Sequence, residues 1–595
     1  MNLQLKTAAA LMLAASLVAS YALAEGGKSP AKKHVATRKA QTPPAPSVEE
    51  QIQALRQELQ GQINSLKNDL AEKDAQLKQA QEAATQAQAN AQKAQADAAA
   101  GQQAVTDNTQ AVSSLKTAVT DMKQANASLA SDISEQSASI KKEFENPSEI
   151  HYKGISISPA GSFIEAATVY RSSATGGGIN TPFTGIPLQY GDTHNVSEFF
   201  GSGRQSRIAI KAQGKLPWGS LTGYYEMDWL GTGITSNNNQ SNSYVVRQRQ
   251  LWTEAALNNG WTISAGQMWS LATETTQGTS NGSEILPATI DPQYQAGFVW
   301  TRQYGFRVSK RVMPGFWLAA AAENAETLNP AGSNMPTNLL IGSAGVGGGL
   351  YNPFANYSFN VAPDMIAKAV FEPGWGHYEV FGIGRFFRDR IYPTGANPYN
   401  DTVTAGGIGG GFRVPLANKM LSIGLKGLWG QGMGRYGDST IADVTIRPDG
   451  SLAPLRAFSA LSTVEINPTK ALNIYMNYGG DYVFRHYYGT SSSAIGYGSP
   501  YVNMSGCNTE PSSGSSFSGI TNPANCGANN KDIQEATFGY WYNFYSGPKG
   551  RLRQGLQYSY FRRYLWSGAG GTTNPGGNAY GDDNVIETSL RYYLP

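Results

Sequence analysis

The sequence predicts an all-β transmembrane barrel of about 16 antiparallel strands, preceded by a long α-helical coiled coil. Residues 48–143 contain neither proline nor an aromatic residue, whereas residues 150–595 alternate polar and apolar side chains between turn-forming segments. The 67 glycines, 31 tyrosines and 11 tryptophans are typical of strands with tight turns and aromatic girdles. Mean hydropathy is −0.36, which suits a barrel because its strands alternate lipid-facing and water-facing residues.

Residues 1–24 have the pattern of a cleavable secretory signal peptide. Lys6 precedes an apolar run from Ala8 to Ala19, and Ala22-Leu23-Ala24 is a small-residue cleavage pattern before Glu25. The run is shorter than the about 20 apolar residues of a membrane-spanning helix. We therefore expect an exported chain that begins near Glu25.

Residues 25–47 are predicted to be a basic, proline-rich tether that is disordered or PPII-like. Its cations could contact an acidic polymer such as peptidoglycan, although a solvated linker is the simpler explanation of such a charge run. Over the whole chain, 46 basic and 43 acidic residues give a net charge of +3, which indicates no nucleic-acid partner.

Residues 48–146 are predicted to form a coiled-coil helix. A heptad seam runs from Ile63 to Ile140, and a stutter near Leu59 joins it to earlier apolar residues. A single helix would leave this stripe in water, so self-association is expected. Val or Ile at a with Leu at d favours a dimer, and the seam alone leaves dimer or trimer open. Pro147 ends the helix.

Period-two stretches define the barrel, which is assigned to residues 147–595. The clearest stretch has an apolar face and a polar face: Leu221, Tyr225, Met227 and Trp229 against Thr222, Tyr224, Glu226 and Asp228. A soluble β-sandwich would alternate in the same way. Charged residues on the polar face and the unequal lengths of the connectors favour the barrel.

Short and long connectors alternate along the barrel. Seven short turns carry Pro, Gly or Asn where tight hairpins need them: 215–219, 258–260, 313–315, 372–374, 416–419, 467–469 and 546–550. With both chain ends on one side, seven short turns imply eight long loops and sixteen strands. The short turns and the coiled-coil arm are then expected to face the periplasm of a bacterial outer membrane.

The two cysteines, Cys507 and Cys526, lie in one Gly-, Ser- and Asn-rich loop. In an exported protein this arrangement predicts a disulfide that closes the loop. Zinc is not expected, because no histidine lies nearby.

Alternation predicts a set of charged side chains that face the lumen: Arg207, Lys211, Glu226, Asp228, Arg247, Arg249, Arg307, Lys426, Arg551 and Arg553. Opposite signs on neighbouring strands allow two explanations. One is a cross-strand salt-bridge ladder that stiffens the wall. The other is a basic strip that raises the anion concentration in the pore.

Other side chains are expected to face the lipid. On the fourth strand these are Val246 and Trp252. Tryptophans near strand ends are expected in the interfacial girdle, or at a subunit contact: Trp218, Trp261, Trp375 and Trp541.

The run Arg247-Gln248-Arg249-Gln250-Leu251-Trp252 through Gly266-Gln267-Met268-Trp269-Ser270 resembles the matching strand pair of the DcaP-like trimeric outer-membrane porins, and the order of signal, heptads and barrel is similar to that family over the whole chain. The resemblance implies a homotrimer embedded in outer-membrane lipid. It also implies a passive channel for small hydrophilic solutes, often anions such as carboxylates. The connector 271–295, with Glu274, Glu284 and Asp291, would fold inward and face the basic strip.

No enzymatic activity, cofactor or metal is expected. The five histidines lie in no G-x-S-x-G or H-E-x-x-H arrangement. A second hypothesis from a different class is a structural anchor between the outer membrane and the cell wall, in which the barrel transports little. Single-channel conductance and co-sedimentation with cell wall distinguish the two.

Overall fold

The computed structural model describes residues 61, 112–129, 132–134, 149–231, 236, 244–329, 335–344, 357–490, 493–507, 510, 526–569 and 579–595. The chain divides into two compact units, Met1–Ser139 and Ile140–Pro595. The predicted signal peptide, the tether and most of the predicted coiled coil lie outside the described residues. Within the described part, no helix is long and apolar enough to cross a membrane.

In the first unit, residues 112–129 and 132–134 are helical. Their seam residues are exposed in the single chain: Val112, Leu115, Val119, Leu129 and Ile133. Exposed apolar side chains at heptad spacing need a partner helix to cover them. The coiled coil and its number of helices stay predictions.

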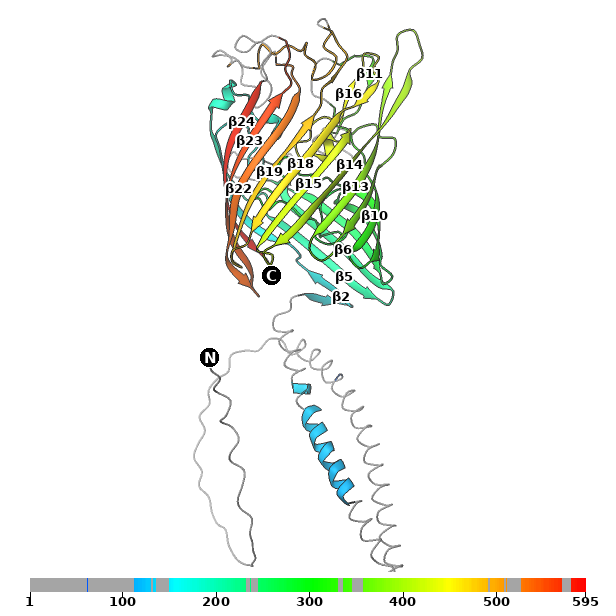
Figure 1. The fold of residues 1–595 in the computed structure, drawn as a ribbon, viewed down its shortest axis with the longest axis vertical. Helices are drawn as coiled ribbons and strands as arrows, with labels where there is room; N and C mark the ends of the chain where they lie inside the picture. Colours follow the sequence, from blue (N-terminus) through cyan, green and yellow to red (C-terminus); the bar gives the residue numbers. More distant parts are fainter. Residues whose placement is uncertain are drawn as a thin grey trace, which may run out of the picture. The chain divides into compact units, whose positions relative to one another are not determined.

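In the second unit, the described residues form sixteen antiparallel strands that close into a barrel (Figure 1). The wall strands are β3 (Phe163–Arg171), β5 (Arg207–Leu216), β6 (Gly219–Gly231), β7 (Val245–Leu257), β8 (Trp261–Trp269), β9 (Arg302–Met313), β10 (Phe316–Glu323), β12 (Asp364–Phe371), β13 (His377–Ile391), β14 (Tyr399–Leu416), β15 (Leu421–Gln431), β18 (Arg456–Ile466), β19 (Leu472–Val483), β22 (Asn530–Gly547), β23 (Gly550–Leu565) and β24 (Tyr580–Tyr593). β24 pairs with β3, which closes the barrel. The predicted number of strands is confirmed.

Shorter strands extend or cover this wall. β1 (Ile150–Tyr152) pairs with β2 (Ile155–Ser158), β2 also pairs with β5, and β4 (Glu198–Ser202) pairs with β3. The connectors contain β11 (Leu339–Leu340), β16 (Val444–Ile446), β17 (Leu452–Pro454), β20 (His486–Tyr487) and β21 (Gly496–Tyr497). They also contain the 3-10 turns Phe183–Gly185, Asp192–Asn195 and Gly434–Tyr436.

All seven predicted short turns join paired neighbouring strands, so these predictions are confirmed. The turn between β9 and β10 shows why the sequence needs glycine there. Gly315 has φ +77°, and a Cβ atom would lie 2.5 Å from the carbonyl oxygen of Glu372. The glycine lets the β9–β10 turn pack against the β12–β13 turn.

The two sides of the wall differ in chemistry. Along β13, buried and more exposed residues alternate, with Phe381 2% and Val380 51% exposed. Inner positions of other strands hold buried charged or polar residues such as Glu226 and Thr463, whereas outer positions hold large apolar residues such as Leu425. An apolar outer face and a polar inner face are the arrangement of a membrane barrel.

The strand β7 contains a bulge that the sequence pattern did not reveal. Glu226 of β6 pairs with Gln250, while the next residue, Met227, pairs with Gln248, so Arg249 is an extra residue. A bulge leaves the extra residue unpaired and bends the strand. Arg249 and Gln250, although adjacent, are therefore both buried.

Two expectations about aromatic residues were wrong. Val246 is 49% exposed as expected, but Trp252 is 6% exposed and stacks on Tyr224, with ring centroids 5.1 Å apart. The prediction that Trp252 faces the lipid assumed unbroken alternation along this strand. The extra residue Arg249 shifts the residues that follow it to the opposite face. Trp541 is 2% exposed, and its indole N–H donates to the carbonyl oxygen of Ala288 inside the barrel. The other three predicted girdle tryptophans are exposed: Trp218, Trp261 and Trp375.

Candidate functional site

The connector between β8 and β9, residues 270–301, folds inward and contacts several sides of the inner wall. The Ala296 N–H donates to Glu535 of β22 at 2.7 Å, and the Gly297 N–H donates to Asp481 of β19 at 3.1 Å. On other strands it contacts Arg249 of β7 through Gln293. The expected inward folding is confirmed, and we call residues 270–301 the inner loop.

The cations of the β12–β15 wall hold the start of the inner loop. Lys426 donates to the carbonyl oxygen of Ala272 and to the carboxylate of Glu379. Lys368 donates to the carbonyl oxygen of Thr273 at 2.8 Å and lies 2.7 Å from Glu379. All three charged side chains are nearly or completely buried.

Arg307 of β9 has the same role farther along the loop. It donates to the carbonyl oxygens of Trp269 at 2.6 Å and Thr279 at 3.4 Å, and to Asn281 at 2.8 Å. Arg307 is 2% exposed. Lys426 and Arg307, both predicted to line the lumen, therefore bind the protein rather than the solvent.

A second group of cations lies across β23, β24, β3, β5, β6 and β7. Strand pairing connects Arg551 to Tyr593, Tyr593 to Phe163, Phe163 to Arg207, Arg207 to Asp228 and Asp228 to Arg247. These residues are consecutive partners in one row across the wall. We call Arg207, Arg247 and Arg551 the arginine row.

Two carboxylates neutralise part of the arginine row. Arg247 donates to Asp228 with two bonds, at 3.1 and 2.9 Å, and Arg207 lies 3.3 Å from Glu226. Arg249 contacts both carboxylates and is 2% exposed. The salt-bridge ladder weighed from the sequence is therefore present around Arg249.

Other cations of this wall have no carboxylate partner. Within the described residues, no ion pair within 4.0 Å involves Lys211, Arg551 or Arg553, and the Arg247 side chain keeps 35% exposure despite its pair. Arg551 and Arg553 lie over the ring of Tyr593, at 4.4 and 4.7 Å from its centroid. Aromatic faces hold a guanidinium in place without neutralising its charge.

Arg591 also belongs to this cluster, although the sequence analysis did not predict it. It pairs in register with Arg553 and Glu165, lies 2.7 Å from the Glu165 carboxylate, and its guanidinium is 4.7 Å from the Trp541 ring. Because Arg591 lies at even spacing from inward Glu587, alternation alone could have found it.

A small gap next to this cluster lies between the inner loop and the β5–β7 wall. It is lined on one side by Arg207 and Arg249 and on the other by Asp291 and Gln293. Its volume is ≈ 10 Å³, room for about one water molecule. Arg249 spans the gap, because it donates to Gln293 at 3.0 Å.

The resemblance had implied that the acids of the inner loop face the basic wall. Only some of them do. Asp291 lines the gap beside Arg207, but Glu274 accepts from Arg413 of β14 at 2.8 Å. Glu284 has a different environment, since burial raises its pKa to about 7. The charge of Glu284 is therefore incomplete at neutral pH.

Many buried polar atoms inside the barrel have no hydrogen-bond partner in the protein. Examples are both side-chain polar atoms of Gln295 and of Asn477, residues that are 0% and 2% exposed. Leaving such atoms unsatisfied in a dry interior costs about 1–3 kcal/mol each. Water inside the barrel would satisfy those atoms that lie on the inner side of the wall.

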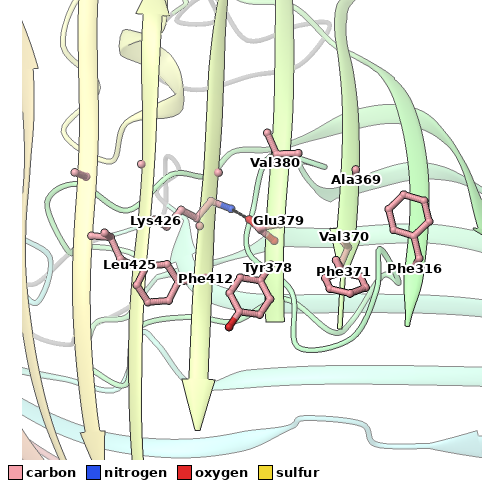
Figure 2. Close-up of a pocket in the computed structure, with 14 residues that line it drawn as sticks. Phe316, Ala369, Val370, Phe371, Tyr378, Glu379, Val380, Phe412, Leu425 and Lys426 are labelled. Atoms are coloured by element: carbon pink, nitrogen blue, oxygen red, sulfur yellow. Dashed lines mark hydrogen bonds and ion pairs between the residues drawn. The ribbon is translucent and has the colours of Figure 1, made fainter. Parts of the chain in front are cut away.

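A larger cavity lies on the apolar outer face of the wall, over β10 and β12–β15. Figure 2 shows Leu425, Phe412, Tyr378 and Phe371 around it, with the bond between Lys426 and Glu379 among the same strands. The cavity has a volume of ≈ 610 Å³, and Leu425 and Phe371 are exposed residues of the apolar outer face.

The connector that carries the cysteines lies at the long-loop end of the wall strands. Cys507 and Cys526 are joined by a disulfide, and both are buried together with Val502 and Met504. No group of three or more potential metal ligands occurs among the residues that the structure describes.

Solved structures contain the same fold. The outer-membrane channel DcaP of Acinetobacter baumannii has a TM-score of 0.51 at 13% sequence identity, over 75% of this chain and 100% of that one. The anion-selective porin of Comamonas acidovorans (TM-score 0.37, 9% identity, 74% and 99% of the two chains) and OmpT of Vibrio cholerae (0.37, 10%, 75% and 100%) are less similar in structure. No family model and no curated protein matches the sequence. The resemblance seen in the sequence is thus confirmed at the level of the fold: the second unit of the chain is a sixteen-stranded barrel similar to that of the outer-membrane channel DcaP.

Proposed function

We propose that the chain is an outer-membrane porin, a passive channel for small hydrophilic solutes that prefers anions such as carboxylates. The observation that carries this proposal is the side of the inner wall that contains the arginine row, where Arg247, Arg551, Arg553 and Lys211 keep charge that no neighbouring carboxylate fully neutralises. A guanidinium can bind a carboxylate with two parallel hydrogen bonds.

The hydrated lumen and the inner loop complete the argument. Unpartnered polar atoms favour water inside the barrel, and the inner loop narrows the passage beside Arg207 and Arg249. A narrow, low-dielectric passage with a positive wall concentrates anions. The assembly belongs to the same proposal: a homotrimer in the bacterial outer membrane, with the coiled coil 48–146 in the periplasm.

The direct test is electrical. The purified protein in planar bilayers should show discrete openings, and a salt gradient should give a reversal potential of the sign for anions. Replacing both Arg247 and Arg249 by Gln should lower the anion-to-cation permeability ratio, with a smaller shift at high salt because of screening. Absence of openings, or a cation-selective wild type, would contradict the proposal.

The anchor hypothesis rests on the tether, which lies outside the described residues, and on the arm, of which the structure describes residues 61, 112–129 and 132–134. A chain that lacks residues 25–143 distinguishes it: a porin keeps its conductance without them, whereas an anchor loses co-sedimentation with cell wall. The expectations of no enzymatic activity and of peptidoglycan contact stay predictions.

A further inference from the structure

The hairpin formed by β13 and β14 extends past its neighbours in the wall. β12 pairs with β13 only as far as Gly384, and β15 pairs with β14 only from Gly407. Beyond these points the two strands pair with each other up to Ile391 and Tyr399. The inner face of this extension packs on the apolar residues of β16 and β17, among them Val444 and Leu452.

A buried acid lies on that inner face. Asp389 is 1% exposed, stands between Phe387 and Ile391, which are each 1% exposed, and neither of its carboxylate oxygens has a hydrogen-bond partner. An isolated buried carboxylate is costly unless something compensates its charge. No Lys, Arg or His of the described chain lies within 4.0 Å of it, since the ion pairs of β13 belong to His377, Glu379 and Arg385.

The nearest charges increase the free-energy cost of a charged carboxylate at Asp389. Asp401 is the direct cross-strand partner of Asp389, and Asp449, from the turn between β16 and β17, also repels the charge of Asp389. Like charges directly opposite each other destabilise a strand pair. The cations next to Asp389 in sequence, Arg388 and Arg390, occupy the other face of the strand, and Arg390 donates to Asn400 there.

We infer that Asp389 and Asp401 together bind a divalent cation, with Ca²⁺ as the expected ion. Directly opposed residues have Cβ atoms about 4.5–5.5 Å apart, so two carboxylates can reach one ion from both strands. Ca²⁺ takes six to eight oxygen ligands in flexible geometry and accepts water among them. That flexibility matters, because no three carboxylate or imidazole side chains of the described residues are already gathered in ligand geometry.

The site would fix the protruding hairpin to the connector that contains β16 and β17. Asn338 donates to the carbonyl oxygen of Asp449 at 3.1 Å, and β11 pairs with Arg390 and Ile391, so three connectors meet at this point. An ion there neutralises the repulsion among Asp389, Asp401 and Asp449. Affinity in the range of extracellular modules, about 10⁻⁴–10⁻³ M, would suit a site at the end of a barrel.

The test uses the full chain, purified free of lipopolysaccharide, at constant neutral pH and ionic strength. Ca²⁺ at a few millimolar should raise the thermal unfolding midpoint of the wild type above its value in chelator by about 1–2 °C. Equilibrium dialysis should find one Ca²⁺ per chain. Asp389→Asn and Asp401→Asn should abolish both effects, and in chelator both variants should unfold at a higher temperature than the wild type, because the repulsion is gone.

The matched control is Asp582→Asn, which removes one Asp from β24 that contacts His194 instead of another acid. This variant should keep the Ca²⁺ response. A wild type that does not respond to Ca²⁺, or a response that Asp389→Asn retains, would overturn the inference. If the wild type does not respond, Asp389 and Asp401 share a proton instead of an ion. If Asp389→Asn retains the response, Ca²⁺ binds elsewhere. A parallel series with Mg²⁺ tests the identity of the ion, since Mg²⁺ demands stricter octahedral geometry.

Discussion

The inner wall uses the same kind of residue in two different ways. On the β12–β15 side, Lys368 and Lys426 are buried and donate to carbonyl oxygens of the inner loop. On the side that contains the arginine row, Arg551 lies over an aromatic ring, and Arg247 keeps 35% exposure. Inward direction alone therefore does not make a cation a ligand for solutes. The number of protein acceptors around each cation decides whether it holds the loop or faces the water.

Removing a loop-holding cation should have the largest effect on stability. In Lys426→Met, the buried Glu379 loses one of its cations and the carbonyl oxygen of Ala272 loses its donor. Breaking a buried ion pair by removing one partner typically costs about 3–5 kcal/mol. We expect a loss near the lower end of this range, because Lys368 still neutralises Glu379. Chemical unfolding in detergent measures it.

The control for that variant is Lys211→Met on β5. Lys211 has no ion pair among the described residues, so its replacement should change the free energy of unfolding by less than about 0.5 kcal/mol. Equal losses in the two variants would show that the distinction between loop-holding and lumen-facing cations is wrong.

A glycine of β8 that pairs with Trp252, three residues after the β7 bulge, should have the next largest effect. Gly266 has φ +128°, and an added Cβ would lie 2.2 Å from the carbonyl oxygen of Leu251 and 2.7 Å from Cα of Trp252. Gly266→Ala should destabilise the barrel by about 1–3 kcal/mol, the usual cost of a strained backbone position. The strain should also displace Arg249 and change ion selectivity.

Gly223→Ala is the matched control. Gly223 lies on β6, the other neighbour of β7, with no heavy atom within 4 Å of an added Cβ and no positive φ. Its unfolding midpoint and selectivity should stay close to those of the wild type. A Gly266→Ala variant that behaves like this control would remove the support for the bulge as the feature that positions Arg249.

Much of this architecture was predictable, and the exceptions have physical causes. Strand number and the short turns follow from local chemistry, because period-two patterns and tight-turn residues act over a few positions. The bulge at Arg249 could not be counted from the pattern, so Trp252 was placed on the wrong face. The roles of Lys426 and Arg307 depend on carbonyl oxygens of the inner loop. Every residue has a carbonyl oxygen, so the sequence does not indicate which ones accept these bonds. Trp541 looked like a girdle residue, yet it lies inside beside Arg553, 3.9 Å from the guanidinium.

The single variants Arg249→Gln and Arg247→Gln should differ in stability, conductance and selectivity. Arg249→Gln leaves Glu226 and Asp228 without their shared cation, so we expect a loss of about 1–3 kcal/mol in unfolding free energy. Arg249→Gln also removes the bond to Gln293 across the gap, which should raise conductance. Arg247→Gln should change selectivity with little loss of stability, because it is the more exposed of the two. Equal unfolding free energies for both variants would contradict this assignment.

The smallest effect is expected for Arg551→Gln, and this variant tests the arginine row most strictly. Arg551 has no carboxylate partner among the described residues, so its replacement breaks no ion pair and should leave the unfolding free energy within about 0.5 kcal/mol of the wild type. Its side chain is nevertheless only half-buried, and its charge lies over the ring of Tyr593. Two charges about 4 Å apart interact by about 1 kcal/mol in water, which sets the scale of a two- to five-fold fall, roughly, in the anion-to-cation permeability ratio at low salt. At molar salt the Debye length is about 3 Å, and the difference from the wild type should nearly vanish. The measurement is the reversal potential across a planar bilayer at both salt concentrations.

Arg562→Gln, which alters an outward-facing arginine later on the same strand, is the control and should leave the ratio unchanged. A ratio that is unchanged in Arg551→Gln at low salt would mean that solutes do not pass this part of the wall, and the arginine row would then have to be regarded as structural.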